Sequence, residues 1–361
     1  MNSTIAYFIS PHGFGHAARA AAVMAALHKA NPAITFEIFT LVPEWFFAEA
    51  LPPVYRYHAL KTDIGLVQSS PLSEDIPATL RALDAFLPFQ NDHIDNIASL
   101  LRQTGCRCAL CDISPLGILA AKKAGIPAIL VENFTWDWIY ESYSSDYPGF
   151  AKHIAGLREI FRLPDAHILA QPFCQPAANP ALEVWPVSRS PQKSRKALRT
   201  ELGLSPQQLV VLITMGGIPE SFAAIDHLLG FQEVTFIIPG GSTHIEQRQN
   251  LILLPHHSSF YHPDLLNACD AAIGKAGYST IAELFHAGLP FGYFSRAGFR
   301  ESACLTEFIK IQMQGIQMQG EHISQTTWLN QLPQLLSLPR MERSQPNGAW
   351  QIADFLIEEI L

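Results

Sequence analysis

The sequence carries little charge for its length and lacks the features that mark membrane or nucleic-acid proteins. Of its 361 residues, 16% are charged and 48% are hydrophobic, and the net charge is −8. This acidic balance, without a long basic run, argues against nucleic acid or an anionic membrane as a partner. No run of about 18 apolar residues is present, which argues against a membrane-spanning helix. The chain also opens on an apolar pattern without the charged leader of a signal peptide. We therefore expect a packed cytoplasmic enzyme with two sizeable cores.

Cysteine is scarce, and its spacing does not favour a metal site. Three of the six cysteines form the pattern Cys106-x-Cys108-x-x-Cys111. A structural zinc site normally uses two separated pairs of ligands. Here Cys108 and Cys111 lie inside one expected apolar strand, which would point their side chains to opposite faces. Buried, reduced thiols explain the pattern better than zinc does.

Strand-like and helix-like patterns alternate along the chain. Such alternation predicts an α/β fold with parallel sheets covered by helices on both faces. A polar break at 188–192 indicates two Rossmann-like domains, which we place at 1–188 and 189–345, with an amphipathic helix in 346–361. The expected strands are 4–9, 35–41, 54–58, 107–112, 128–132, 166–171, 182–187, 209–215, 235–238, 251–254, 271–273 and 291–294. The expected helices of the first domain are 16–29, 78–87, 91–103, 117–124 and 153–161.

The most informative stretch is 269–301. A short apolar strand ends at Gly274, a turn with Gly277 follows, and a helix begins at Ser279 or Thr280. The free N–H groups and the positive dipole end of a helix N-terminus attract an anion. Because glycine has no side chain, a bulky anion could approach the backbone closely. The pattern therefore predicts a phosphate site.

Glu283 lies one turn inside the same predicted helix and allows two interpretations. It could reach a sugar hydroxyl of a ligand bound at the turn. Equally, Thr280 and Glu283 have the spacing of a capping box, in which the glutamate bonds to the Thr280 N–H. Periodicity alone does not distinguish the two.

Residues 274–290 resemble the donor signature of GT-B glycosyltransferases, Gly-x-x-Ser/Thr-x-x-Glu followed by Gly-x-Pro. The stretch is similar to the peptidoglycan N-acetylglucosaminyltransferase and to UDP-glucosyl and glucuronosyl transferases. It is closer still to the glycosyltransferase-like N-terminal half of L-arabinokinases, which carries a similar Gly-Lys-x-Gly-Tyr-x-Thr turn, with Lys275 and Tyr278 at those places here. The resemblance implies a GT-B fold, in which two Rossmann-like domains face each other across a cleft and the last helix packs back on the first domain.

The turn after the first strand is the second chemical feature. Residues 11–19 are a poor dinucleotide fingerprint, because the glycine spacing is wrong. They resemble the Gly-x-Gly-His loop of the same transferases and the arabinokinase motif Gly-Phe-Gly-His-x-x-Arg. The resemblance implies that His16 is a general base, although it could instead cap the helix or bind phosphate. We expect His12 to be an ordinary loop residue.

A histidine base is oriented better by a neighbouring carboxylate. Asp112 ends a predicted strand, and parallel strands end at one edge of a sheet, so Asp112 should lie near His16. The surrounding segment resembles the one that supplies this aspartate in plant UDP-glycosyltransferases. Asp112 could alternatively cap the following helix.

Aromatic residues follow the next strand. Asn133, Phe134 and Trp136 would suit a sugar or glycoside acceptor, but a buried aromatic cluster would look the same. Residues 44–47 could form a membrane-facing patch, and a helix face packed on the sheet is the alternative.

Taken together, the sequence and the resemblance predict an inverting glycosyltransferase that uses a nucleoside diphosphate sugar, preferably a UDP-sugar, with His16 and Asp112 as the catalytic pair. The sequence contains no Asp-x-Asp pair to hold a metal on the diphosphate, so we expect neither a metal nor another cofactor. A nucleotide-sugar-binding module without turnover and a GT-B-fold epimerase remain alternatives. The acceptor could be a small molecule, a glycan or a lipid-linked sugar reached by peripheral membrane contact. The residues assigned to the donor are Gly15, Met215, Gly216, Gly217, Gly274, Lys275, Gly277, Tyr278, Ser279, Thr280, Glu283, Arg300 and Glu301. Family members often have an amide-rich pair where this chain has Arg300 and Glu301, which leaves the choice of sugar open.

Overall fold

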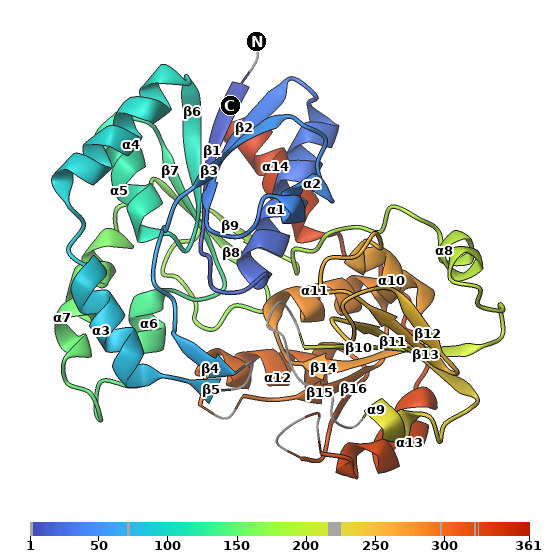
Figure 1. Cartoon of the computed structure of the whole chain (residues 1–361). Helices are drawn as coiled ribbons and strands as arrows, with labels where there is room; N and C mark the ends of the chain where they lie inside the picture. Colours follow the sequence, from blue (N-terminus) through green and yellow to red (C-terminus); the bar gives the residue numbers. More distant parts are fainter. Residues whose placement is uncertain (1–2, 71–72, 216–224, 297, 321–322, 324) are drawn as a thin grey trace.

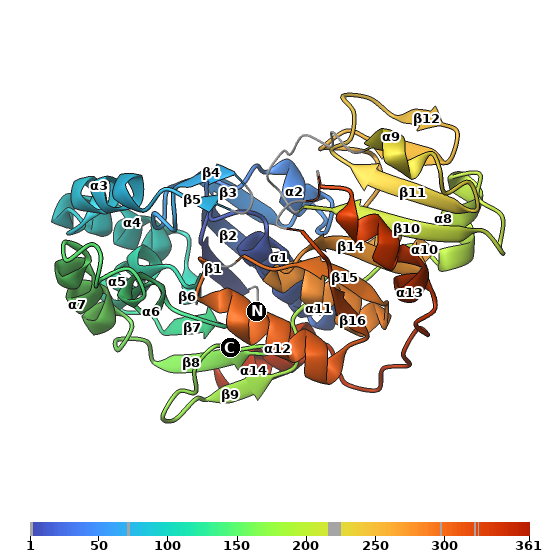
Figure 2. The ribbon, with the colours of Figure 1, turned by 90° about the horizontal axis from the view of Figure 1, so that it is seen from below.

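The computed structural model describes residues 3–70, 73–215, 225–296, 298–320, 323 and 325–361. It contains two seven-stranded sheets flanked by helices, one in each half of the chain (Figure 1 and Figure 2). The predicted α/β fold of two Rossmann-like domains is confirmed.

The first sheet has the order β3-β2-β1-β6-β7-β8-β9, and all of its neighbouring strands are parallel. Its strands are β1 (Ser3–Ile9), β2 (Ile34–Thr40), β3 (Tyr55–Ala59), β6 (Cys106–Asp112), β7 (Ala128–Glu132), β8 (Ala166–Ala170) and β9 (Leu182–Val184). A small ribbon of β4 (Gln68–Ser70) and β5 (Ser73–Glu74) lies outside this sheet. The helices of this half are α1 (Gly15–Ala30), α2 (Trp45–Ala48), α3 (Ile76–Phe86), α4 (Asn91–Gln103), α5 (Pro115–Ala124), α6 (Trp136–Glu141) and α7 (Phe150–Ile160).

The second sheet has the order β12-β13-β11-β10-β14-β15-β16. Its strands are β10 (Leu209–Thr214), β11 (Val234–Pro239), β12 (Glu246–Arg248), β13 (Leu251–Leu254), β14 (Ala271–Lys275), β15 (Phe291–Phe294) and β16 (Gly315–Gln317). The edge strand β12 is antiparallel to β13, which the sequence patterns did not predict. The helices are α8 (Arg195–Glu201), α9 (Ile225–Leu228), α10 (His262–Ala268), α11 (Tyr278–Ala287), α12 (Glu301–Gln312), a 3₁₀ turn (Thr327–Gln331), α13 (Leu332–Leu336) and α14 (Gly348–Glu359).

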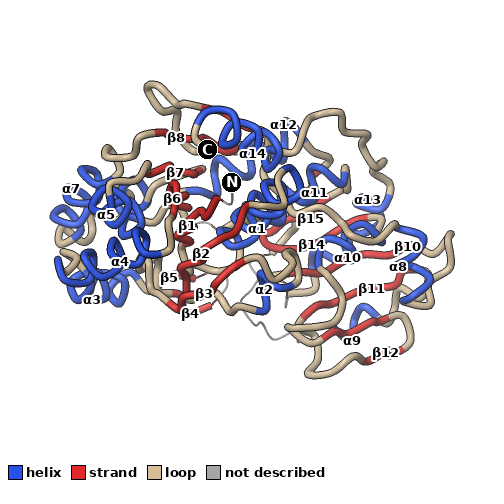
Figure 3. The backbone as a smooth tube through the Cα atoms, turned by 90° about the horizontal axis from the view of Figure 1, so that it is seen from above, coloured by secondary structure: helices blue, strands red, loops and turns tan. Residues whose placement is uncertain are grey.

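Helix α1 joins the sheet to the end of the chain. Alanine favours helix and leaves little side-chain bulk, so α1 can be buried on more than one side. One face packs on the first sheet, and another contacts α14, whose Ile352, Ala353 and Leu356 belong to the same core (Figure 1). Figure 3 shows α1 and α11 between the two sheets, where the two helices also contact each other.

The cysteine pattern lies in β6, where Cys108 packs on one face and Cys106 and Cys111 on the other. All three are free and buried, as predicted. Burial raises the pKa of Cys106 to about 11 and that of Cys108 to about 12, which keeps both thiols protonated at neutral pH.

Within the part of the chain that the structure describes, every helix is too short or too polar to span a lipid bilayer.

Candidate functional site

The predicted contact between His16 and Asp112 is present at the C-terminal edge of the first sheet. Strands β1 and β6 run parallel with Ile9 opposite Asp112, so the turn after β1 lies beside the end of β6. His16 is in the first turn of α1, and its Nδ1 lies 2.7 Å from Asp112 Oδ1. The interpretation of Asp112 as a helix cap is wrong, because Ser114 accepts the capping bond from Gly117 at the start of α5.

Arg19 binds the same carboxylate from the next turn of α1. Its Nε lies 2.7 Å from Asp112 Oδ2 and its Nη2 lies 2.6 Å from Oδ1, and both side chains are buried. Burial alone would raise the pKa of Asp112, but the Arg19 guanidinium outweighs this and holds that pKa below its usual range. The carboxylate is therefore charged and can only accept hydrogen bonds. Nδ1 of His16 therefore donates to this carboxylate, and in the neutral tautomer that base catalysis requires, Nε2 is the acceptor.

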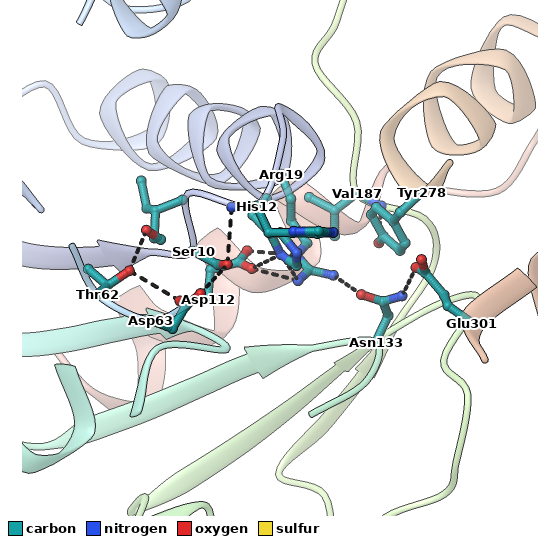
Figure 4. Close-up of polar contacts among 12 residues, drawn as sticks. Ser10, His12, Arg19, Thr62, Asp63, Asp112, Asn133, Val187, Tyr278 and Glu301 are labelled. Atoms are coloured by element: carbon teal, nitrogen blue, oxygen red, sulfur yellow. Dashed lines mark hydrogen bonds and ion pairs between the residues drawn. The ribbon is translucent and has the colours of Figure 1, made fainter. Parts of the chain in front are cut away.

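The polar chain continues from Arg19 to the second half of the molecule. Arg19 Nη1 donates to Asn133 Oδ1 at 2.8 Å, and Asn133 Nδ2 donates to Glu301 Oε1 at 2.7 Å (Figure 4). The Arg19 guanidinium also lies 4.7 Å from the ring centroid of Tyr278, whose hydroxyl accepts from the Val187 N–H. These contacts fix the orientation of the Asn133 amide and connect α1 with α11 and α12.

Sequence reasoning gave Arg19 no role, although it is the last residue of the Gly-Phe-Gly-His-x-x-Arg pattern. Residues three apart lie on one face of a helix, so the spacing of His16 and Arg19 already placed them side by side. Asp112 was expected beside His16, but its pairing with Arg19, 93 residues away, was not predicted.

A cleft opens beside this network, between the N-termini of α1 and α11. A Cβ atom at Gly15 would lie only 3.9 Å from Ser279 Oγ across it. The lining comes from both halves of the chain: His12, Gly13, Phe14, Gly15, His16, Arg19, Gln68, Asn133, Phe134, Lys275, Ala276, Gly277, Tyr278, Ser279, Thr280, Arg296, Phe299 and Glu301.

A second, more aromatic cavity lies on the other side of the α11 N-terminus. It is lined by Phe14, Ala18, Trp45, Phe46, Glu49, Arg189, Thr214, Pro239, His256, Ser258, Phe260, His262, Leu265, Ser279, Thr280 and Glu283. Ser279 and Thr280 line both cavities. A helix N-terminus, which favours negative charge, thus lies between an aromatic cavity and a polar cleft.

Glu283 is held by two partners in the second cavity. Arg189 Nε donates to its Oε1 at 2.9 Å, and His262 Nδ1 lies 3.0 Å from its Oε2. Burial would raise the pKa of Glu283, but Arg189 dominates and lowers it, so the carboxylate is charged. The capping-box interpretation is wrong, because α11 begins after Gly277 and no side chain of the described residues caps it.

The glycine turn differs in part from the expectation. Strand β14 continues to Lys275, so Gly274 lies inside the sheet, where a Cβ would come within 2.0 Å of the Thr214 carbonyl oxygen. Gly274 therefore permits close strand packing and does not line the cleft. Lys275 and Gly277 do line it.

Met215 and Arg300, which the sequence analysis assigned to the donor site, line neither the cleft nor the second cavity. Met215 is buried in the apolar core of the second sheet and lines neither cavity. Gly216 and Gly217 lie outside the described residues. Arg300 contacts α6, where its Nη1 lies 2.9 Å from Glu141 and its guanidinium stacks on Trp138. Its neighbour Glu301 lines the cleft.

The aromatic residues after β7 divide between cleft and core. Asn133 and Phe134 line the cleft. Trp136 is 1% exposed and packs against Phe134 and Tyr140, so it belongs to the buried aromatic cluster that was the alternative interpretation.

Helix α2 contacts the second half of the chain as well as the first sheet. Trp45 stacks on His257 with ring centroids 4.2 Å apart, and Phe47 is buried in the first core. The burial of Phe47 agrees with the expected helix face packed on the sheet, but the expectation did not include the place of Trp45 and Phe46 in the second cavity.

Among the residues that the structure describes, no group of three or more histidine, cysteine, aspartate or glutamate side chains is placed to hold a metal ion.

No protein-family model matches the sequence of this chain. It is 27% identical over 365 residues to an L-arabinokinase from Arabidopsis thaliana, an alignment that covers 98% of this chain and 34% of the relative. The chain thus spans about a third of the length of the curated relative it matches.

The chain also superposes on solved structures of other proteins, at low sequence identity. The chain superposes on the glycotransferase of kitacinnamycin with a TM-score of 0.65 at 16% identity, covering 99% of both chains. A UDP-glucosyltransferase from Polygonum tinctorium gives 0.61 at 14% identity, covering 100% of this chain and 94% of the other. A putative UDP-N-acetylglucosamine 2-epimerase from Listeria monocytogenes gives 0.60 at 10% identity, covering 99% and 95%. The chain therefore has the GT-B fold, with two Rossmann-like domains and a cleft lined by both, as the resemblance of residues 274–290 implied.

Proposed function

We propose that this protein is an inverting glycosyltransferase that moves a hexosyl or N-acetylhexosaminyl group from a nucleoside diphosphate sugar, preferably a UDP-sugar, to a hydroxyl acceptor. The observation that carries the proposal is the His16–Asp112 contact of 2.7 Å at a cleft that also receives the N-terminus of α11. The GT-B fold and the names of its structural neighbours support the same class of reaction.

The donor would extend across the α11 N-terminus. Its base and ribose would occupy the second cavity, where aromatic rings offer stacking surfaces and the charged Glu283 can accept ribose hydroxyls. Its diphosphate would lie at Ser279 and Thr280, where the helix dipole and Lys275 counter the negative charge. Its sugar would then enter the cleft next to His16 and Glu301.

In the reaction, the acceptor hydroxyl gives its proton to His16 Nε2. Its oxygen forms a bond to the anomeric carbon, and the bond from that carbon to the diphosphate oxygen breaks, so the nucleoside diphosphate leaves with the electron pair. Asp112 keeps the ring in the required tautomer and stabilises the imidazolium. With the base opposite the leaving group, the acceptor oxygen attacks the face of the anomeric carbon opposite the diphosphate, so the anomeric configuration inverts. Incubation with UDP-sugars and acceptors, followed by NMR of the anomeric proton of the product, tests the proposal.

Glu283→Gln should weaken UDP binding by about 1–3 kcal/mol, because it removes the charge from a buried hydrogen-bond acceptor. The substitution keeps the side-chain shape and one oxygen opposite Arg189. Calorimetry with UDP measures the effect. Glu201→Gln, at an exposed carboxylate paired with Lys193, is the matched control. Unchanged affinity in a folded Glu283→Gln variant would leave Glu283 only a structural partner of Arg189.

We also expect turnover to be insensitive to chelators, because α11 and Lys275 can take the place of a metal on the diphosphate. An assay with and without a chelator, followed by magnesium or manganese, measures this. Activity that disappears with the chelator and returns with the metal would contradict the expectation.

A nucleotide-sugar-binding module without turnover is the second candidate, and one contact favours it. Arg19 already neutralises Asp112, so less of the carboxylate charge is left to stabilise an imidazolium. UDP binding without turnover for any donor would support this candidate. Conversion of the donor sugar to its epimer without an acceptor would support an epimerase.

A further inference from the structure

One end of the cleft presents hydrogen-bond donors without acceptors. Arg296, in the segment after β15, is 5% exposed and forms an ion pair through Nη2 with Glu74 of β5. Its guanidinium lies 4.1 Å from the Phe299 ring centroid, and its Nε is buried with no hydrogen-bond partner among the described residues. A buried guanidinium N–H without an acceptor is costly, which indicates that a ligand completes the site.

Gln68 provides a second such donor from β4, opposite Glu74 in the small ribbon. Its amide nitrogen Nε2 is buried and, in the part of the chain that the structure describes, also lacks a hydrogen-bond partner. Both Gln68 and Arg296 line the cleft, one from each half of the chain.

His12 provides the third donor, which corrects its interpretation as an ordinary loop residue. Its Nδ1 accepts from the Leu66 N–H at 3.3 Å, and the ring packs so closely on Gly65 that a Cβ there would lie 2.8 Å away. Burial, followed by the nearby Arg296 charge, holds the pKa of His12 well below its usual range, so the ring is neutral. With Nδ1 accepting, the proton sits on Nε2.

We propose that Arg296, Gln68 and His12 bind a carboxylate of the substrate at this end of the cleft. A hydroxyl ligand would bring a proton that needs its own acceptor, whereas a carboxylate only accepts and can satisfy several donors. Among the described residues that line the cleft, Arg19, Lys275 and Arg296 are cations and Glu301 is the one carboxylate. Glu301 Oε1 is already bonded to Asn133, and burial raises its pKa, which limits repulsion.

This inference rests on the proposed function, and the carboxylate could belong to either substrate. On the donor it would be that of a uronic acid, since Arg296 comes from the half of the chain that carries α11. On the acceptor it would be that of a sugar acid, since Gln68 and His12 come from the other half. Both sources share the same chemistry, so the experiment needs one arm for each.

Calorimetry on the full chain with matched ligands separates the two. In the donor arm, UDP, UDP-glucose and UDP-glucuronate are compared. In the acceptor arm, free glucose and free glucuronate are titrated into protein saturated with UDP. We expect the glucuronate ligand of one arm to bind about tenfold or more tighter than its neutral counterpart, as for hydrogen bonds to a charged group. Arg296→Gln should abolish the preference and Gln68→Leu should reduce it, while UDP affinity stays unchanged.

The control is Arg158→Gln, which removes a half-exposed arginine of α7 away from the cleft and should keep the preference. If Arg296→Gln does not fold, Gln68→Leu and the wild-type ligand pairs still decide the question. UDP binding without a preference for glucuronate in either arm would overturn the carboxylate site and leave the proposed function intact. Failure to bind UDP at all would instead contradict the proposed function.

Discussion

His16→Ala should lower turnover by about 10²–10⁴-fold, the usual cost of losing a general base. Nε2 of His16 is the acceptor left at the cleft once Nδ1 donates to Asp112. UDP affinity should change little, because the expected base and ribose contacts lie around Glu283, in the second cavity. The measurements are steady-state turnover, UDP calorimetry and NMR of the product, which should show a β-linkage from an α-linked donor.

The matched control for this prediction lies on the same helix. His28→Ala removes a histidine from the last turn of α1, at the opposite end from the cleft, and should leave turnover unchanged. Near-normal turnover of His16→Ala, or a product with retained configuration, would remove His16 from the mechanism. The binding module would then be the better explanation if UDP still binds.

Asp112→Ala should lower the free energy of unfolding by about 3–5 kcal/mol, because it leaves the Arg19 charge buried without its partner. Arg19 is 1% exposed, and two of its three guanidinium nitrogens bond to Asp112. Urea unfolding measures the effect. Asp95→Ala, which breaks an ion pair of half-exposed side chains with Lys123, should cost no more than about 1 kcal/mol and is the control.

The ion pair between Asp112 and Arg19 also predicts how the free energy of unfolding depends on pH. The pKa of Asp112 is lower in the folded chain than its usual value, so its contribution is present above the usual carboxylate pKa and is lost as the pH falls through the folded value. The wild type should therefore lose its advantage over Asp112→Ala in acid. A double variant that adds Arg19→Met should recover part of the stability, because no buried charge is then left unpaired. A cost of Asp112→Ala as small as that of the control would contradict the prediction.

The ion pair between Asp112 and Arg19 also matters for the activity of Asp112 variants. Asp112→Asn should reduce turnover less than His16→Ala if the aspartate only orients the ring. Because Arg19 depends on the same carboxylate, the stability of Asp112→Asn must be measured beside its turnover. Otherwise, a loss of turnover caused by partial unfolding of the variant at the assay temperature would be mistaken for a catalytic effect.

The sequence by itself determined the fold class and the two turns that matter. Local patterns were sufficient for strands such as β7, β13 and β15, whose bounds match the expectation, because a buried strand between turns is specified by neighbouring residues. The edge strand β12 was missed, since three mostly exposed residues carry no apolar pattern. The approach of His16 to Asp112 followed from one rule, that parallel strands end at the same edge of a sheet.

Apart from the contact between His16 and Asp112, only the tertiary structure decided what the residues of the site contact. Arg19 and Glu283 each find a charged partner about 90 residues away, and no local pattern encodes a pairing over that distance. Phe134 and Trp136 are two positions apart and belong to one buried aromatic cluster, yet only Phe134 of the two also lines the cleft, because α7 and the second half of the chain pack against this cluster. The three donors of the proposed carboxylate site come from segments separated by more than 50 residues each, and folding alone brings them to one cleft.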